Sequence, residues 1–233
     1  MLVMLRKTSP ILAVAAVLLS AGAASSAPPA QPVVVELFTS QGCSSCPPAD
    51  VALAQVADRP DVIALSFGVT YWDNLGWKDT FARREFTERQ RAYAQRMGHA
   101  PYTPEVIAGG RADSVGNSKS IIEGLIARAR GPAATSITAD LDSADVAAGV
   151  APRGGADVWL VRYDPRTVRV PVRAGENTGK TLPIRNVVRS LTRLGQWDGA
   201  AASFRYPVAT DGLESVVIVQ TRDGGPILAA ARA

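Results

Sequence analysis

Apolar residues in the first half of the chain fall into two short, nearly continuous runs with a helical pattern between them. The runs are residues 33–38 and 62–67, and both are rich in β-branched and aliphatic side chains. Such runs are typical of strands that are covered on both faces of a sheet. Between them, Val51, Leu53 and Val56 belong to an apolar set with helical spacing. The order strand, helix, strand predicts a βαβ unit with two parallel strands.

The pattern continues with two more helices and a third strand. Residues 77–97 are strongly charged, with a line of apolar residues on one side, which predicts a long helix with a solvated face. A strand is expected from Tyr102 to Ile107, followed by a hairpin turn at Gly109-Gly110. Asn117, a residue type that favours the N-cap position, is expected to begin a further helix.

After residue 132 short β-rich runs replace the helical spacing. They are residues 135–141, 157–163, 167–172, 215–221 and 227–231, the last preceded by a hairpin turn at 223–225. Residues 184–194 have helical spacing in a β context and stay ambiguous, and the polar loop 175–179 receives no assignment. The pattern predicts an N-terminal α/β domain, residues 28–131, followed by a β-rich C-terminal domain or subdomain, residues 132–233.

Composition and charge exclude some partners. A chain of 233 residues with 47% hydrophobic and 20% charged residues can bury a full core. Its formal net charge is +4, and Arg6 and Lys7, which lie in a predicted leader, supply two of those charges. The remaining charge is too small to indicate binding to nucleic acid or to an acidic membrane surface. The sequence does not indicate an oligomeric state.

Residues 1–27 have the pattern of a secretory signal peptide. Arg6 and Lys7 are followed by an apolar stretch from Ile11 to Leu19 and then by small residues up to Ala27. The alternative is an uncleaved anchor, but the apolar stretch is short compared with the roughly 20 residues that span a bilayer. We therefore expect cleavage of the leader, no stable membrane insertion afterwards, and a secreted or periplasmic protein. That compartment allows a disulfide to persist.

The two cysteines of the chain, Cys43 and Cys46, lie where the first predicted strand leads into the first helix. N–H groups at a helix N-terminus stabilise a thiolate, which is the form that attacks disulfides. A Cys-x-x-Cys pair at this place is typical of a thioredoxin-like redox site. A structural disulfide is one alternative. A closed zinc site would need two more nitrogen or sulfur ligands, and the chain offers one histidine, His99.

The run from Glu36 to Asp50, which contains both cysteines, resembles the signature of a family of secreted, thioredoxin-like bacterial proteins, the domain of unknown function 1223. Residues 71–79 and Tyr102-Thr103-Pro104 are similar to the same family. The resemblance extends from about Val33 to the end of the chain. It implies a fold and a dithiol rather than a known substrate.

The resemblance also assigns roles around the dithiol. It implies that Thr103-Pro104 is the cis-proline turn that packs against the Cys-x-x-Cys of thioredoxin-like proteins and shapes a substrate groove. Tyr71 and Trp72 follow a parallel strand, so they are expected to wall one side of that groove. The alternative is that these rings only cap the core. The chain has Gly68-Val69-Thr70 where relatives would have a His-Val-Asp-like run, so an acid or imidazole that assists proton transfer there would be missing. Asp73 is the remaining candidate for that role.

These observations predict an exported thiol–disulfide oxidoreductase. Cys43 is expected to be the nucleophile and Cys46 the resolving cysteine, with protein or small-molecule thiols and disulfides as partners. No cofactor and no metal are expected, and the direction of the reaction does not follow from the sequence. The alternatives are a thioredoxin-fold binding module without catalysis, which would carry a peptide or Cu(I) held by two thiolates with the help of His99, and a purely structural disulfide.

The topology makes a geometric prediction. The cysteine turn and the loop 71–77 both follow parallel strands, so they share one edge of the sheet. The Thr103-Pro104 turn precedes a strand that is antiparallel to those two in thioredoxin-like folds, so it should lie at the same edge. Pro104 should be cis, and His99 is expected to be a surface or packing residue.

Overall fold

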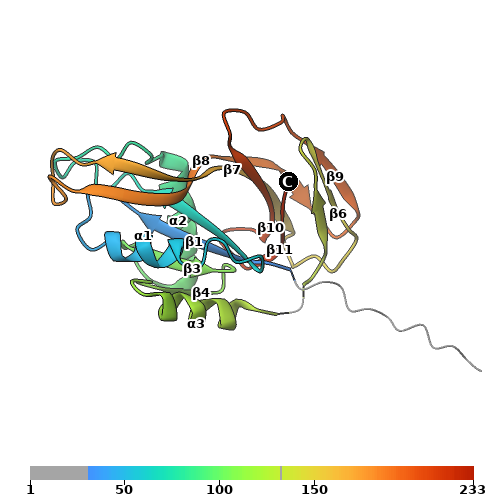
Figure 1. Cartoon of the computed structure of the whole chain (residues 1–233). Coiled ribbons are helices and arrows are strands. Elements are labelled where there is room, and N and C mark those ends of the chain that lie inside the picture. Colours follow the sequence, from blue (N-terminus) through green and yellow to red (C-terminus); the bar gives the residue numbers. More distant parts are fainter. Residues whose placement is uncertain (1–30, 132) are drawn as a thin grey trace, which may run out of the picture.

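One large sheet runs through the protein, with helices on both of its faces (Figure 1). A computed structural model describes residues 31–131 and 133–233, so the predicted leader, residues 1–27, lies outside the described residues. The helices are α1 (Pro47–Ala54), α2 (Arg84–Met97) and α3 (Lys119–Ala129). The strands are β1 (Val33–Thr39), β2 (Val62–Gly68), β3 (Glu105–Ala108), β4 (Ala112–Ser114), β5 (Ile137–Ala139), β6 (Ser143–Val146), β7 (Ala156–Pro171), β8 (Thr181–Trp197), β9 (Ala202–Arg205), β10 (Glu214–Thr221) and β11 (Ile227–Arg232).

The predicted βαβ unit forms the centre of the large sheet. β1 and β2 pair in parallel from Val33↔Val62 to Thr39↔Gly68, and all residues of both strands are buried. α1 connects them and begins with Pro47 and Pro48, at positions where a missing N–H costs little. On the other side of β1, β3 runs antiparallel, as predicted, and forms a hairpin with β4 through Gly109-Gly110. The apolar pattern therefore predicted the parallel pair β1–β2, and the family resemblance implied the antiparallel direction of β3.

Alternate side chains of β1 enter two different cores. Val35 and Leu37 pack with α1 and α3 on one face of the sheet. Val34 and Phe38 pack on the other face, with Phe86 and Tyr93 of α2 and with strands β7 and β10. The sheet is thus covered on both faces, which explains why its central strands lack polar alternation.

Glu36 is a charged residue in the middle of this apolar strand, and α2 supplies its partner. Its side chain is fully buried, and Arg89 Nε donates to Glu36 Oε1 at 2.6 Å while Nη2 donates to Oε2 at 3.1 Å. The Tyr93 hydroxyl also donates to Glu36, and Gln220 of β10 donates to the same hydroxyl at 2.9 Å. A buried carboxylate is tolerated when it is paired and hydrogen-bonded in this way. The network fixes α2 against the centre of the sheet.

The β-rich second half of the chain extends the same sheet. In the described residues the strand order is β11-β10-β7-β8-β2-β1-β3-β4, with β8 parallel to β2 and joined to it at Ser66↔Val187. Asn186, at a positive φ of 53°, places its side chain so that Nδ2 donates to the Ala64 carbonyl at 2.8 Å. The strands of residues 28–131 and of residues 132–233 therefore share hydrogen bonds. The division into domains at residue 132 stays a prediction.

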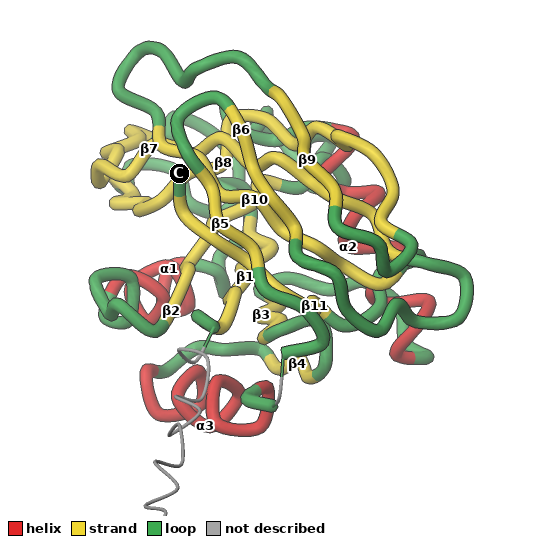
Figure 2. The backbone as a smooth tube through the Cα atoms, turned by 90° about the vertical axis from the view of Figure 1, so that its right-hand side faces the viewer, coloured by secondary structure: helices red, strands yellow, loops and turns green. Residues whose placement is uncertain are grey.

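A smaller sheet covers one end of the large one. It has the order β5-β6-β9, and Figure 2 shows it in front of β10 and β11. Ile137 and Val146 of this sheet pack with Val158 of β7, Trp197 of β8 and Val217 of β10. This third core closes the end of the molecule that is remote from α1 (Figure 1).

Two local predictions were wrong, and the structure decides a third segment that was left open. The charged helix begins at Arg84 rather than at residue 77, because Asp79 accepts hydrogen bonds from the backbone of Phe81 and Ala82 and holds that segment as a loop. The third helix is capped by Ser118, whose Oγ accepts from the Ile121 N–H, and not by Asn117. Residues 184–194, left open between helix and strand, belong to strand β8. Among the described residues no helix is both long and apolar enough to cross a membrane.

We expect Arg89→Ala to destabilise the protein strongly, because it leaves the Glu36 carboxylate buried without its cation. The free energy of unfolding should fall by roughly 3–5 kcal/mol, measured by urea denaturation. Arg91→Ala, an exposed position on the same helix, is the control and should change stability by less than about 0.5 kcal/mol. Equal effects of the two substitutions would show that the buried pair does not hold α2.

Candidate functional site

Cys43 and Cys46 form a disulfide at the start of α1, with their Cα atoms 5.5 Å apart. Cys46 is the N-cap residue of the helix, and its N–H donates to the Cys43 carbonyl at 3.3 Å. Ser44 and Ser45 between them are exposed, but both cysteines are 0% exposed. Because a disulfide sulfur carries no hydrogen, the Ser45 hydroxyl is the donor in its 3.3 Å contact with Cys43 Sγ. The turn is at the surface, while its sulfurs are covered.

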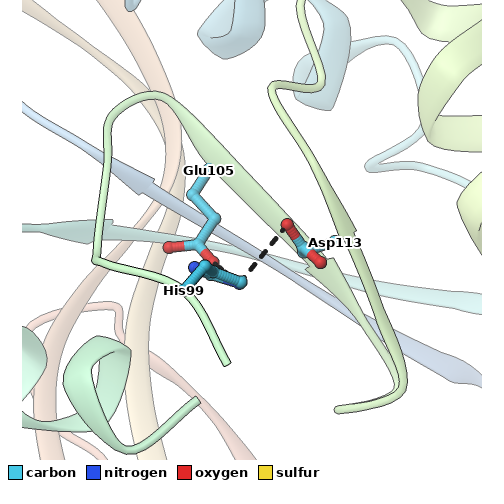
Figure 3. Close-up of side chains that lie close together, drawn as sticks. All are labelled: His99, Glu105 and Asp113. Atoms are coloured by element: carbon cyan, nitrogen blue, oxygen red, sulfur yellow. Dashed lines mark ion pairs between the residues drawn. The ribbon is translucent and has the colours of Figure 1, made fainter. Parts of the chain in front are cut away.

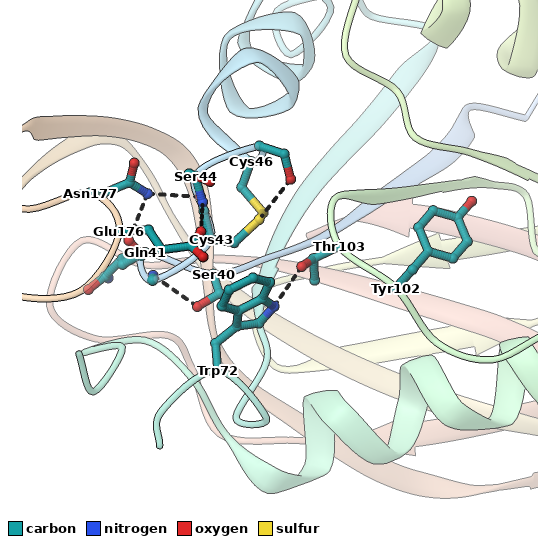
Figure 4. Close-up of a disulfide and its surroundings, with 12 residues drawn as sticks. Ser40, Gln41, Cys43, Ser44, Cys46, Trp72, Tyr102, Thr103, Glu176 and Asn177 are labelled. Carbon is teal, nitrogen blue, oxygen red and sulfur yellow. Dashed lines mark hydrogen bonds between the residues drawn. A yellow bond between two sulfur atoms is a disulfide. The ribbon is translucent and has the colours of Figure 1, made fainter. Parts of the chain in front are cut away.

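The structure brings the three predicted segments together around this turn (Figure 4). Trp72 Nε1 donates to Thr103 Oγ1 at 2.7 Å. This bond links the loop 71–77, here called the aromatic loop, to the Thr103-Pro104 turn. A Cβ added to Gly42 would lie 3.6 Å from the Trp72 Cβ, so the start of the Trp72 side chain also lies beside the cysteine turn. The Thr103-Pro104 peptide bond is cis, and Pro104 is buried. The convergence and the cis bond agree with the geometric prediction.

Two other predicted site residues point elsewhere. Tyr71 donates from its hydroxyl to Gln90 Oε1 at 3.2 Å, on α2, and burial raises the pKa of Tyr71 to about 12. Asp73 Oδ1 accepts from the Asp79 N–H at 3.1 Å, within its own loop. These contacts give Tyr71 and Asp73 structural partners. Their proposed roles in a groove or in proton transfer stay predictions.

The polar loop that the sequence left unassigned lies against the cysteine turn. Residues 172–180, here called the hairpin tip, connect β7 to β8 at the end nearest α1 (Figure 1). Asn177 is fully buried there, and its Nδ2 donates to the Cys43 carbonyl at 2.8 Å and to the Gln41 carbonyl at 3.0 Å. Glu176 accepts at 3.0 Å from the Ser44 N–H. The hairpin tip is thus attached to the backbone of the cysteine turn itself.

Neighbouring contacts position the hairpin tip. Lys180 Nζ donates to Asn177 Oδ1 at 2.9 Å, which fixes the orientation of the amide. Gly175 has a φ of +75°, and a Cβ there would lie 3.2 Å from the Trp77 Cβ. A larger residue would be strained in that conformation and would press on the indole. The close approach of the tip to the aromatic loop therefore depends on glycine.

A buried polar network lies on the other side of the cysteine turn. The Gln41 N–H donates to Asp79 Oδ2 at 2.7 Å, and Trp77 Nε1 donates to Gln41 Oε1 at 3.0 Å. Burial raises the pKa of Asp79, although the three backbone N–H groups that bind its carboxylate act in the opposite direction. Gln41 therefore connects the cysteine turn to the loop 71–80.

Asp50 is a buried acid one helical turn after Cys46. Its N–H donates to the Cys46 carbonyl at 3.2 Å, and its side chain is 4% exposed. Burial raises the pKa of Asp50 to about 8, with Thr39 lowering it and the charge of Asp79 raising it further. Within the described part of the chain, Asp50 Oδ1 has no hydrogen-bond partner. At neutral pH the carboxyl is thus held largely in its neutral form.

Sequence reasoning missed several residues of this site. Asn177 and Glu176 come from a loop more than 130 positions after the cysteines, and nothing in their local pattern indicated that distance in space. Gln41 and Asp50 lie inside the signature run, residues 36–50, but its pattern indicated a role only for the cysteines. The signal in the sequence was an acidic residue, Asp50, in the first turn of the helix that follows the dithiol.

These features define a mixed α/β protein with a buried Cys-x-x-Cys disulfide. The chain also matches, over residues 34–220, the family described as "Protein of unknown function (DUF1223)". It belongs to that family, in agreement with the resemblance seen in the sequence. No curated protein matches the chain.

Two solved structures are similar. The crystal structure of protein AGR_C_4864 from Agrobacterium tumefaciens has 31% sequence identity and a TM-score of 0.73, and the match covers 88% of this chain and 95% of that one. HBP35 of Porphyromonas gingivalis has 12% identity and a TM-score of 0.51, covering 88% of this chain and 75% of that one. The second likeness concerns the fold alone.

We expect Asn177→Ala to speed the reduction of the disulfide. The substitution removes two hydrogen bonds that hold the hairpin tip on the cysteine turn, each of about 1 kcal/mol, so reduction by dithiothreitol should be roughly tenfold to thirtyfold faster. Alkylation of the released thiols followed by mass spectrometry gives the rate. Thr178→Ala, at an exposed position in the same tip, is the control. If both variants are reduced at the same rate, the amide of Asn177 does not control access to the sulfurs.

Asp50 should make stability depend on pH. Its pKa is about 8 in the folded protein and about 3.9 when unfolded. The unfolded chain therefore loses this proton first, and stability falls as pH rises from 4 to 8. Asp50→Asn should remove that contribution. Relative to wild type, the free energy of unfolding of the variant should therefore rise by about 1.4 kcal/mol per pH unit across this range.

Urea denaturation at several pH values measures this difference. Asp58→Asn, whose parent side chain is 76% exposed, controls for the loss of one carboxylate. A constant difference between Asp50→Asn and wild type from pH 4 to 8 would contradict the assignment of a neutral buried acid.

Proposed function

We propose that this protein is an exported thiol–disulfide oxidoreductase whose N-terminal region has a thioredoxin-like fold. The observation that carries the proposal is the place of the Cys43–Cys46 disulfide, at a strand-to-helix turn between the aromatic loop and the Thr103-Pro104 turn. The fold is supported by the parallel pair β1–β2 around α1 and by the antiparallel hairpin β3–β4 followed by α3. Export rests on the leader pattern of residues 1–27.

The reaction is an exchange of two electrons between two sulfur pairs. In the reduced protein the Cys43 thiolate attacks one sulfur of a partner disulfide, forms a mixed disulfide and releases a partner thiolate, which takes a proton from solvent. The Cys46 thiolate then attacks the Cys43 sulfur and releases the second partner thiol. The partner disulfide is reduced and Cys43–Cys46 is oxidised. The reverse sequence oxidises a partner dithiol.

Exchange requires the hairpin tip to leave the cysteine turn. Both sulfurs belong to residues that are 0% exposed, and attack at a disulfide sulfur needs room for an approaching thiolate. Loss of the contacts of Asn177 and Glu176 with residues 41–44 would free the exposed side of the turn without disturbing the strands of the sheet. The hairpin tip is therefore the moving part in this proposal.

Glu176 would oppose thiolate formation while the tip is closed. Its carboxylate binds the Ser44 N–H, a backbone donor between the two cysteines, and this contact lowers the pKa of Glu176. A negative charge near Cys43 disfavours a second one on the sulfur. Opening of the tip would thus both expose the sulfur and remove a like charge from its surroundings.

The complete burial of the cysteines favours one competing function, a disulfide that only holds the turn in place. The two candidates differ in reduction potential, because structural disulfides are typically more reducing than about −300 mV. Equilibration of the chain with glutathione and dithiothreitol buffers, with the free thiols counted by mass spectrometry, measures this potential. We expect a value above about −300 mV.

Mapping of the reactive thiol completes this test. A brief alkylation of the reduced protein at mildly acidic pH should label Cys43 before Cys46, since a nucleophile at the start of the turn reacts first. A potential far below −300 mV would favour the structural disulfide. Labelling of Cys46 first would reverse the two assigned roles.

A further inference from the structure

His99, Glu105 and Asp113 form a second cluster of chemically active side chains, outside the disulfide site (Figure 3). His99 follows the left-handed Gly98 that ends α2, Glu105 begins β3, and Asp113 lies on β4. Asp113 pairs with Ile107, two residues beyond Glu105, so both carboxylates are on the same face of the hairpin. One ligand atom from each of the three residues lies within 4.8 Å of the others.

The imidazole of His99 presents a lone pair to the two carboxylates when it is neutral. His99 Nδ1 lies 3.0 Å from the Ala100 carbonyl oxygen, which can only accept, so Nδ1 carries the hydrogen. His99 Nε2 then has no hydrogen and faces Glu105 Oε1 at 3.7 Å and Asp113 Oδ2 at 3.6 Å. Three electron-rich atoms that face one another are unfavourable unless a cation lies between them.

Apart from the ion-pair contacts of His99 with the two carboxylates, two buried atoms of the cluster lack a polar partner among the described residues. Among the residues that the structure describes, Glu105 Oε1 and His99 Nε2 are buried without a hydrogen-bond partner, and Glu105 is 0% exposed. A buried carboxylate oxygen without a partner is costly. Separations of 3.6 and 3.7 Å exceed hydrogen-bond length. They are close to the roughly 3.4 Å that separates two ligands of a tetrahedral Zn²⁺ with bonds of about 2.0–2.2 Å.

Neighbouring side chains hold each ligand in place. The Tyr102 hydroxyl donates to Asp113 Oδ2 at 2.7 Å, and Gln90 Nε2 donates to Glu105 Oε2 at 2.6 Å, which leaves Oε1 turned to the cluster. The Ala100 carbonyl fixes the tautomer of His99. Outer hydrogen bonds that orient the ligands in this way are a general feature of metal sites.

We propose that His99, Glu105 and Asp113 bind a divalent transition-metal ion, with Zn²⁺ as the ion that fits one imidazole nitrogen and two carboxylate oxygens. No metal was expected from the sequence, because the two cysteines and one histidine are too few for a closed zinc site. His99 and Asp113 have side chains 28% and 27% exposed, so the ion can enter from solvent and keep a water molecule in its fourth position. The site ties the end of α2 to the β3–β4 hairpin. It does not depend on the redox proposal.

The test measures Zn²⁺ binding to the disulfide form by isothermal titration calorimetry, with a chain that carries no polyhistidine tag. We expect one Zn²⁺ per chain, with an affinity that falls by at least about tenfold in His99→Gln and in Asp113→Asn. Tyr102→Phe removes a positioning residue and should weaken binding by roughly 10- to 100-fold. Glu85→Gln, an exposed acid on α2, is the matched control and should bind like the wild type.

A second readout uses the single histidine of the chain. In ¹⁵N-labelled protein the one pair of imidazole nitrogen signals belongs to His99, and Zn²⁺ should shift Nε2 to a metal-bound position while Nδ1 stays protonated. Three results would overturn the proposal: affinity unchanged in His99→Gln, binding only after reduction of the disulfide, or an imidazole that stays a protonated ion-pair partner in the presence of Zn²⁺.

Discussion

The buried pair of Glu36 and Arg89 is the interaction on which the arrangement of the molecule depends. Glu36 is the charged residue in the middle of β1, and its carboxylate can stay there only because Arg89 and Tyr93 of α2 bind it. This requirement sets the position of α2 on the sheet. The aromatic loop precedes α2 and His99 follows it, so both the surroundings of the disulfide and the His99 cluster are placed by the same charge pair.

The strands that could be predicted from the sequence are those whose burial is regular. Strands β1, β2, β10 and β11 are short apolar runs, and their pattern alone indicates them. Residues 184–194 have partly helical spacing because β8 is irregular. Its pairing with β7 passes over Asn186 and Arg189, which shifts the phase of the buried side chains and produces spacings of three and four. The segment 77–83 resembled a helix because Trp77 and Phe81 are apolar, but they pack against β7 and β8 instead.

Prediction of the candidate site succeeded where topology decides and failed where a distant loop decides. The positions of Trp72 and Thr103 follow from the directions of β1, β2 and β3. The apolar runs indicate the parallel pair β1–β2, and the family resemblance implies the antiparallel β3. The hairpin tip comes from two strands of 16 and 17 residues that reach from the far end of the sheet to α1. The length of such a hairpin depends on pairing between residues far apart in sequence, so a single sequence does not reveal where its tip will lie.

Because the disulfide is buried, the rate at which reagents attack it would report the opening of the hairpin tip in the proposed mechanism. Three hydrogen bonds join the hairpin tip to residues 41–44. At about 1 kcal/mol each, their loss in the proposed open form would keep that form near 1% of the population. In the proposed mechanism a reagent that attacks the sulfurs would meet only this fraction. A partner that binds the long β7–β8 hairpin and favours one of its positions could therefore change the reactivity of Cys43 without touching either cysteine. Each 1.4 kcal/mol of difference in binding free energy between the two positions would change that reactivity tenfold.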